Sequence, residues 1–507
     1  MSAEDYRRIA DAVAADIADG RLRPGDRLPT QRAFARAHRI ANSTATRVYR
    51  ELARRGLTVG EVGRGTYVRA ARHAPGPALA EPAPAGTVPV NLELNYPVVP
   101  EQSALLAAGL APLLRPDALG AALRPLAPAG TPAARAAAAA LLSGPALRAD
   151  PDHLRFAGNG RQAMAGALAS LVPPGGRLGV EAFTYPMVKG IAARLGITLV
   201  PLATDADGLR PDAVRAAHRA APLRALYVQP TLHNPLGVTM SAGRRAELAA
   251  TLGELDLWAV EDAVWAFLHP DGAADGDGAA SGAAGGDRTG EGDRTADRDR
   301  AADRSCPGDA AAPDATSATG TARPPLAALA PDCTILVDSL SKRLAPGLTV
   351  GLALAPPAHT GRLSAALRSG GWTATGFALE AVTRWLTDGS LERIVAAKRQ
   401  DAAVRQALLR ERLAGFRVHA DPRAYFAWWE LPARWRAETF LAAAARHGIA
   451  VTPAAAFAVA AEGAQGAGPA PNAVRLALAG PAHEPLAQAL TTLAALAHGT
   501  PDDSLPD

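Results

Sequence analysis

Apolar residues recur along the chain at two spacings that predict different elements. Short apolar runs that end at polar or glycine-rich turns predict strands, and apolar residues repeated every three or four positions predict helices. The expected strands are residues 177–182, 197–202, 224–230, 257–262 and 334–342, with helices such as 159–171 and 241–253 between them. This alternation predicts a mostly parallel sheet covered on both faces. Ligands bind such sheets at the carboxyl ends of the strands, where Asp262 and Lys342 fall.

The first 69 residues follow a different pattern. Apolar positions predict a helix over 5–19, a second helix that begins after a capping Thr30, and a third that begins near Asn42 or Ser43. The expected buried face of the third helix consists of Ala45, Val48, Tyr49 and Leu52. Residues 56–69 predict two short strands joined by a Gly-Arg-Gly turn. Three helices followed by a β-hairpin predict a winged helix.

Charge is distributed unevenly between this segment and the rest of the chain. Residues 1–69 contain 14 Arg, no Lys and 8 Asp or Glu, a net charge of +6, whereas the whole chain carries +4. A basic surplus at one end is typical of a nucleic-acid-binding module, although a solvated charged face has the same composition. Lysine is scarce, since Lys189, Lys342 and Lys398 stand against 50 Arg. A lysine in a motif is therefore informative, because its amine, unlike a guanidinium, can lose a proton and act as a nucleophile.

Composition also divides the 507 residues into domains. Residues 1–69 form the first domain, and the Ala- and Pro-rich residues 70–90 are expected to be a linker. The second domain is expected over 91–500, followed by a tail at 501–507. Residues 271–325 contain no Leu, Ile, Val, Met, Phe, Tyr or Trp, which predicts a disordered insertion within the second domain.

Several classes of protein are disfavoured by the sequence. No apolar run approaches the roughly 18 residues that span a bilayer, and the polar start has no signal-peptide core. Two cysteines, Cys306 and Cys333, are too few for a disulfide framework or a cysteine-rich zinc site, so no metal site is expected. The sequence therefore favours a soluble cytoplasmic protein.

The third helix of the predicted winged helix begins with short polar residues that can approach base edges, beside arginines that can bind phosphate. The segments GRLRPGDRLPTQRAFA (20–35), NSTATRVYRELARRGL (42–57) and GRGTYV (63–68) resemble the GntR-type winged-helix domain. The resemblance implies contacts to double-stranded operator DNA from Arg32, Asn42, Ser43, Thr44, Thr46, Arg47 and Arg64. Many members of that family have Arg at the position of Asn42, so the base preferred there stays open. The alternative is a winged helix used only for dimerisation or protein contact.

Three motifs in the first half of the second domain carry candidate chemistry. FAGNGRQAMAGAL (156–168) predicts a strand end, a Gly turn and a helix N-terminus, which can hold a phosphate. VEAFTYPM (180–187) places Tyr185 after a strand. YVQPTLHNPLGVTMS (227–241) presents the side-chain amide of Asn234 in a turn.

Two further motifs follow buried apolar runs. Asp262 in AVEDAVW (259–265) either caps a turn or pairs with a buried cation. Lys342 in VDSLSKRLAPGLTVG (337–351) can form a Schiff base if its amine is partly desolvated, although a surface lysine is the alternative.

In this order and spacing, the five motifs resemble those of fold-type I aminotransferases, which use pyridoxal 5′-phosphate (PLP). The resemblance implies a catalytic Schiff-base lysine at Lys342 and a carboxylate partner of the pyridine nitrogen at Asp262. It implies that Asn234 bonds the ring hydroxyl, that Tyr185 stacks on the ring, and that Arg475 in NAVRLALAG binds the carboxylate of the substrate or effector. The residues implied at the phosphate are Gly160, Arg161, Gln162 and Ser339.

A GntR-type winged helix linked to an aminotransferase-like domain resembles the architecture of MocR-type regulators. The implied fold is a winged helix-turn-helix followed by an α/β domain with a mostly parallel sheet and a smaller C-terminal α+β subdomain. The implied function is transcriptional regulation by a head-to-tail homodimer that senses an amino compound through an aldimine. Two alternatives stay open: an active aminotransferase with a vestigial DNA-binding extension, and a regulator whose degenerate large domain no longer uses PLP.

The sequence departs from this family pattern around the cofactor. The family usually has an Arg on the phosphate where this chain has Thr349, and a Tyr near the ring hydroxyl where it has Val264. No Tyr precedes the Gly in LRPLAPAG (123–130), and Arg161 stands where the phosphate turn usually has Ser or Thr. One hypothesis is that Arg161 supplies the missing cation, with Arg343 as the other candidate; the second is that the site has decayed. We expect PLP binding to be retained.

Overall fold

The computed structural model describes residues 5–18, 21–23, 25–55, 57–61, 65–68, 90–269, 323–460 and 470–500. Apart from Val90 and residues 323–325, the expected linker, insertion and tail lie outside these residues. Among the helices in the described ranges, none combines the length and apolar character needed to cross a bilayer.

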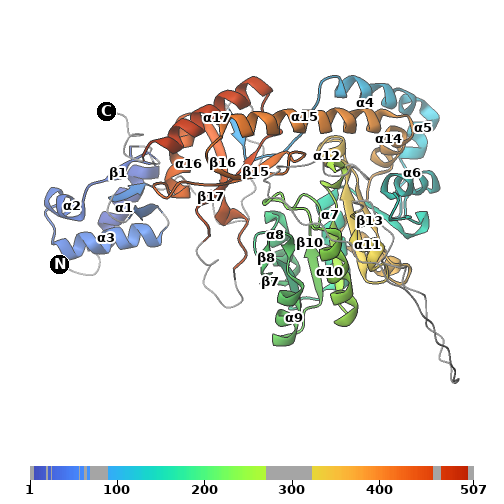
Figure 1. The fold of residues 1–507 in the computed structure, drawn as a ribbon, viewed down its shortest axis with the longest axis horizontal. Helices are drawn as coiled ribbons and strands as arrows, with labels where there is room; N and C mark the ends of the chain where they lie inside the picture. The colour runs from blue at the N-terminus through green and yellow to red at the C-terminus, as the bar shows by residue number, and fades with distance from the viewer. Residues whose placement is uncertain are drawn as a thin grey trace, which may run out of the picture. The chain divides into compact units, whose positions relative to one another are not determined.

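The described residues between 5 and 68 confirm the predicted winged helix (Figure 1). Its helices are α1 (Asp5–Ala18), α2 (Gln31–Ala37) and α3 (Asn42–Arg54), and its strands are β1 (Arg27–Leu28), β2 (Thr58–Glu61) and β3 (Gly65–Val68). The strands form an antiparallel sheet in the order β1-β3-β2. Thr30 caps α2 as expected, since its hydroxyl accepts a hydrogen bond from the Ala33 backbone N–H at 3.2 Å. The four residues predicted to face the core of α3 are all buried.

A seven-stranded sheet forms the centre of the large domain. Its strands are β5 (Leu154–Ala157), β6 (Arg177–Glu181), β7 (Thr198–Leu202), β10 (Ala225–Val228), β11 (Trp258–Asp262), β12 (Thr334–Ser339) and β13 (Gly351–Leu354). Their order is β5-β13-β12-β11-β10-β6-β7, and only β13 runs antiparallel to its neighbours. The predicted mostly parallel sheet is therefore confirmed.

Helices cover both faces of this sheet, which explains why its strands are apolar on both sides. The helices are α7 (Gly160–Leu171), α8 (Pro186–Leu195), α9 (Pro211–Ala220), α10 (Ala242–Glu254), α11 (Leu326–Leu329) and α13 (Thr360–Ser369). Tyr227 and Val260 pack on one face with α7, α8 and α13. Leu226 and Ala259, one position earlier on the same strands, pack on the other face with α9, α10 and α11.

A smaller α+β unit contains a second sheet, in the order β14-β15-β17-β16-β4. Its strands are β4 (Val90–Leu92), β14 (Arg417–His419), β15 (Phe426–Glu430), β16 (Ile449–Pro453) and β17 (Ala473–Ala477). Its helices are α15 (Ser390–Arg412), α16 (Ala437–Arg446) and α17 (His483–His498). The subdomain predicted at the C-terminus thus exists, but it also includes β4, which pairs in parallel with β16 from a point more than 300 residues earlier in the chain.

The remaining helices pack around a separate apolar cluster beside the large sheet. They are α4 (Gln102–Leu110), α5 (Pro116–Ala122), α6 (Pro132–Leu142) and α14 (Gly376–Thr387). A one-turn helix, α12 (Leu340–Arg343), follows β12 directly and contacts the long helix α15. It carries Lys342, so the position of this short helix decides where the candidate amine lies.

Candidate functional site

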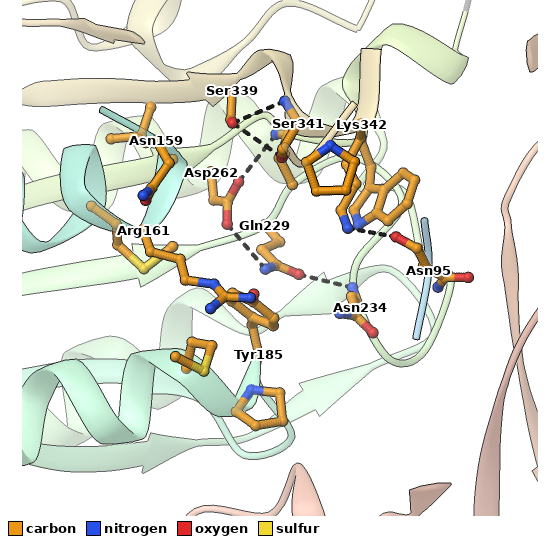
Figure 2. A pocket seen from close by; sticks show the side chains of 18 of the residues that line it. Asn95, Asn159, Arg161, Tyr185, Gln229, Asn234, Asp262, Ser339, Ser341 and Lys342 are labelled. Carbon is orange, nitrogen blue, oxygen red and sulfur yellow. Dashed lines mark hydrogen bonds between the residues drawn. The ribbon is translucent and has the colours of Figure 1, made fainter. Parts of the chain in front are cut away.

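A cavity of about 600 Å³ opens at the carboxyl ends of β10, β11 and β12, next to the N-terminus of α7 (Figure 2). The residues predicted from the sequence that line it are Gly160, Arg161, Tyr185, Asn234, Asp262, Ser339, Lys342 and Arg475. Thr349 and Val264, the two departures from the family pattern, line it too. Of the predicted cofactor residues, only Gln162 is absent from the lining of this cavity among the described residues.

The Lys342 amine points into this cavity. It donates a hydrogen bond to the Asn95 backbone oxygen at 2.5 Å and lies 4.8 Å from the centre of the Tyr96 ring. Burial and, to a smaller extent, the cations Arg161, Arg475 and Lys398 together lower the pKa of the amine to about 7. About half of the Lys342 amines are therefore neutral near pH 7, and a neutral amine can act as a nucleophile.

Asp262 ends β11 and is 5% exposed. Its carboxylate accepts hydrogen bonds from the Tyr227 hydroxyl at 2.6 Å, the Gln229 amide at 3.3 Å and the Val264 backbone N–H at 3.0 Å. Burial raises the pKa of Asp262, and the bonds from Tyr227 and Val264 oppose that rise. Within the described ranges, no cation pairs with this carboxylate, so its donors are all neutral.

Gln229 connects Asp262 to Asn234. Its side-chain oxygen accepts a hydrogen bond from the Asn234 backbone N–H at 2.8 Å, while its amide donates to the Tyr227 hydroxyl at 2.6 Å. The Gln229 backbone N–H in turn donates to Glu181 at 3.0 Å. The Asn234 side-chain oxygen is buried and has no hydrogen-bond partner among the described residues. An unpaired buried acceptor of this kind is costly, so the site has capacity for another polar group.

Arg161 and Tyr185 lie together on the side of the cavity formed by the starts of α7 and α8 (Figure 2). Tyr185 precedes α8, and burial raises the pKa of its hydroxyl. The positive charge of Arg161 and a hydrogen bond from its guanidinium oppose this rise in the pKa. The Arg161 guanidinium therefore faces the cavity, although the side chain is exposed overall.

The N-terminus of α7 meets the end of β12 at close range. A Cβ atom added at Gly160 would lie 2.6 Å from the Cβ of Ser339, so only glycine fits. The Ser339 hydroxyl lies 3.1 Å from that of Ser341 and 3.2 Å from that of Thr349. Asn159 caps α7 by accepting a hydrogen bond from the Gln162 backbone N–H at 3.0 Å. This end of the cavity thus combines hydroxyls with a helix N-terminus, a combination suited to an anion.

Arg343, the other candidate cation, is engaged elsewhere. Its guanidinium bonds the fully buried Asp338 carboxylate at 2.6 Å and lies over the Phe267 ring. Among the described residues, Arg161 is therefore the cation left at the α7 end of the cavity.

Arg475 reaches the cavity from β17. It is 5% exposed, and its guanidinium donates to the Glu93 backbone oxygen and, at 3.2 Å, to the Thr452 hydroxyl. Burial lowers its pKa to about 10. Its Nε has no hydrogen-bond partner among the described residues, so the guanidinium retains a donor for a ligand.

The winged helix presents most of its predicted DNA-contacting residues to solvent. Arg32, Asn42, Ser43 and Arg47 are exposed, Thr44 and Thr46 are half-buried, and Arg64 lies outside the described residues. The Thr46 hydroxyl bonds the Gln31 side chain at 2.8 Å. A hollow between α2, α3 and the strands is lined by Arg32 and Asn42, and also by Arg27, which the sequence analysis did not select.

Comparison with known families assigns both domains. The family model for aminotransferase class I and II matches residues 112–286 and 305–493, and the model for bacterial regulatory proteins of the gntR family matches residues 5–68. The chain belongs to the aminotransferase class I and II family. Because a GntR-type domain precedes it, the arrangement is that of a MocR-type regulator, as predicted.

Relatives of this MocR-type chain match it over most of its length. The uncharacterized HTH-type transcriptional regulator YdeF of Bacillus subtilis is 26% identical over 90% of this chain and 87% of its own. The HTH-type pyridoxine biosynthesis transcriptional regulator PdxR of Corynebacterium glutamicum is 24% identical over 76% and 74%. Among solved structures, the α-aminoadipate aminotransferase LysN of Thermus thermophilus matches at 20% identity with a TM-score of 0.63, covering 81% of this chain and 92% of that one. The last likeness shows the fold.

Sequence reasoning missed several residues of the MocR-type cavity. Tyr227 and Gln229 stand two positions apart, so the period of a strand places them on the same face as the predicted ligand edge. Both residues stand at the start of the motif YVQPTLHNPLGVTMS (227–241), so this spacing could have identified them. Gln229, Asn95, Tyr96 and Trp265 line the cavity, whereas Tyr227 is not among the described residues that line it and acts through its hydrogen bond to Asp262. Asn95 and Tyr96 come from a segment with no motif, and only the fold brings them to Lys342.

Proposed function

We propose that this MocR-type protein is a transcriptional regulator that binds operator DNA through its winged helix, and PLP and a primary-amine effector in the cavity. Relatives that cover most of the chain are named transcriptional regulators, which supports the regulatory role. The effector would favour one conformation of the protein and so change its affinity for DNA. This requires the effector to bind the two conformations with different affinities.

The cavity fits PLP, the cofactor of the aminotransferase class I and II family, in three respects. Asp262 is a buried carboxylate surrounded by neutral donors, which suits a protonated ring nitrogen. Asn234 has a buried polar atom without a partner among the described residues. Gly160 leaves open the space beside Ser339 at the start of α7, where backbone N–H groups favour an anion.

When bound, PLP would supply an aldehyde that reacts with primary amines and a ring that withdraws electrons. Lys342 would provide the neutral amine, and Asp262 would hold the proton of the ring nitrogen. Asn234 and Tyr185 would orient the ring. Arg161 and Ser339 would bind the phosphate, and Arg475 would bind the effector carboxylate. The observation that carries the proposal is that an amine, a carboxylate and a guanidinium, from Lys342, Asp262 and Arg475, face one cavity.

Adding PLP to the purified full-length protein tests the cofactor. We expect a yellow absorbance band that saturates with PLP concentration and changes when the effector, a primary amine, is added. A protein that stays colourless and still binds its promoter would instead be a regulator that does not use PLP.

Binding to genomic fragments tests the DNA-binding role. Arg47→Ala should weaken binding and lower the slope of log affinity against log salt by about one phosphate contact. Substitutions of Asn42 and Thr46 should change which sequences are bound. Arg368→Ala, an exposed arginine on α13, is the matched control and should leave the slope unchanged. An unchanged slope in Arg47→Ala would remove this residue from the interface.

An active aminotransferase is the second candidate function, because Lys342 and Arg475 line the same cavity. Amino-group transfer between an amino acid and a keto acid at ordinary enzyme rates, without sequence-specific DNA binding, would establish it. Transfer that is slow or undetectable, together with DNA binding, would establish the regulator.

A homodimer, with its two chains head-to-tail, completes the proposal. Large apolar side chains are exposed at Val98, Leu114 and Leu123, with 57%, 68% and 84% of their surface accessible. Pairing of the two chains over these side chains would remove their apolar surface from water. Sedimentation of the full chain should give a dimer, and Leu123→Asp should shift it towards monomer if this surface is the interface.

A further inference from the structure

Lys398, the last of the three lysines in the chain, is not among the described residues that line the cavity. It lies in the middle of α15 and has no solvent exposure. Its ammonium donates to the backbone oxygen of Lys342 at 2.9 Å and to that of Leu344. A buried lysine is rare, because an ammonium loses its hydration on burial, and it persists only when hydrogen-bonded.

Both acceptors lie at the C-terminal end of α12, the one-turn helix that carries Lys342. The last carbonyls of a helix have no partner within the helix, so another group must satisfy them. Gln102 from α4 also donates to the Leu344 oxygen, at 3.1 Å. Side chains from α4 and α15 therefore fasten the turn immediately after Lys342, while the Lys342 amine is fixed at its other end by Asn95.

Burial and neighbouring charges change the pKa values of both Lys398 and Lys342. Burial lowers the pKa of Lys398 to about 7, and Asp401 opposes this. Lys342 faces the cations Arg161, Arg475 and Lys398, and the carboxylates Asp262 and Asp338 line the same cavity. Removal of the Lys398 charge would therefore make protonation of Lys342 easier.

We propose that Lys398 is a positioning residue for Lys342: its ammonium holds the carbonyls at the end of α12 and so keeps the Lys342 amine buried in the cavity. The inference rests on the proposed function only in that Lys342 is the reactive amine.

Competitive acetylation of the cofactor-free full-length protein tests the inference without PLP. The protein is treated with trace acetic anhydride at a series of pH values, and mass spectrometry gives the extent of modification at Lys189, Lys342 and Lys398. In the wild type, we expect Lys342 to titrate near pH 7. In Lys398→Met, we expect this midpoint to rise by at least about one unit towards 10.5, because Lys342 gains water and loses a neighbouring cation.

Affinity for PLP is the second readout. We expect Lys398→Met to raise the dissociation constant about tenfold, since the Lys342 carbonyl loses the Lys398 donor, the Leu344 carbonyl keeps only Gln102, and the turn loosens. The matched control is Lys189→Met, because Lys189 also donates to two backbone oxygens, those of Ala456 and Ala458. Loss of either lysine would lower stability, because both donate to backbone oxygens, but only Lys398→Met should move the Lys342 midpoint.

A Lys398→Met protein that folds with an unchanged Lys342 midpoint would overturn the inference. If Lys398→Met does not fold, the same acetylation measurement is made on Lys398→Arg, which keeps a positive charge and hydrogen-bond donors at this position. We expect its Lys342 midpoint to stay near the wild-type value, and a clear rise would show that donors and charge at position 398 do not hold Lys342. If the wild type binds no PLP, the proposed function fails while the acetylation result still stands.

Discussion

The two ends of the cavity are built differently. At the Lys342 end, formed by Asn95, Asp262, Lys342 and Arg475, each charged group is hydrogen-bonded: Lys342 to one backbone oxygen, and Asp262 and Arg475 to two or more groups each. At the α7 end, formed by Gly160, Arg161, Ser339, Ser341 and Thr349, the polar groups are mostly hydroxyls bonded to one another. Among the described residues, Arg161 is the single cation at this end, and its side chain is exposed.

This difference bears on the two hypotheses for the cofactor site: that Arg161 supplies the cation missing at Thr349, or that the site has decayed. A phosphate carries nearly two negative charges at neutral pH, and a half-buried dianion without a cation is costly. With Thr349 neutral and Arg343 bound to Asp338, one exposed side chain has to supply the charge at the α7 end. The Lys342 end does not have this weakness, because buried contacts hold each of its charges. Substitutions at the α7 end are therefore expected to weaken PLP binding by removing the one cation that the described residues offer to its phosphate.

Lys342→Ala tests the Lys342 end and has the largest expected effect. Loss of the only amine lining the cavity among the described residues should abolish the yellow absorbance band with added PLP. Circular dichroism should show a retained fold. Lys189→Ala should keep the band, and a Lys342→Ala protein that keeps it as well would show that another amine reacts.

Arg161→Ser tests the α7 end. We expect the PLP dissociation constant to rise about tenfold to a hundredfold, because a hydrogen bond to a charged group contributes about 1.5–3 kcal/mol. Adding Thr349→Arg should restore much of the loss, since it places a cation beside Ser339. Absorbance titration measures both.

The control for this test is Arg368→Ser, which removes an exposed helical arginine outside the cavity. Its PLP affinity should equal that of the wild type. If Arg161→Ser also binds PLP as the wild type does, compensation by Arg161 is wrong, and a decayed site becomes the better account.

The local elements could be predicted from the sequence because their causes are local. The strands of the large sheet lie between covering helices, so their apolar runs are nearly continuous, and Thr30 caps α2 by a bond three residues away. The pairing of β4 with β16 could not be predicted, because nothing in either segment specifies a partner so far along the chain. The antiparallel direction of β13 likewise depends on its neighbours β5 and β12.

The same division holds for the site. Asp262 and Lys342 follow strands whose apolar runs are visible, so their position at the ligand edge could be predicted. Asn95 accepts a hydrogen bond from the Lys342 amine, and Lys398 donates one to the Lys342 backbone oxygen. Both residues come from other segments that carry no motif. Their role depends on tertiary contacts between α12, α15 and the segment after β4.

The dependence of stability on pH sharpens the comparison, because Lys342 and its buried neighbour Lys398 both titrate near neutrality. Lys342 and Lys398 have pKa values of about 7 in the folded protein and 10.5 ordinarily. Between these values the unfolded chain binds more protons, so the free energy of unfolding should rise with pH. Each lysine adds at most about 1.4 kcal/mol per pH unit.

Urea denaturation of the cofactor-free protein at pH 7.5 and pH 9 measures this rise. Lys398→Met should show a smaller rise than the wild type, because one of the two titrating amines is gone. Equal pH dependence in the two proteins would mean that Lys398 titrates at its ordinary value when folded.

Tyr227→Phe probes the Lys342 end with the smallest expected effect. The substitution removes one hydroxyl donor from Asp262 and leaves the Gln229 and Val264 donors in place. A single hydrogen bond contributes about 1 kcal/mol, so the PLP dissociation constant should rise only about fivefold. Tyr49→Phe, which removes a buried hydroxyl from the winged helix, should leave PLP affinity unchanged. If Tyr227→Phe weakens PLP binding more than Arg161→Ser does, the Lys342 end is the fragile one, and the contrast between the two ends is reversed.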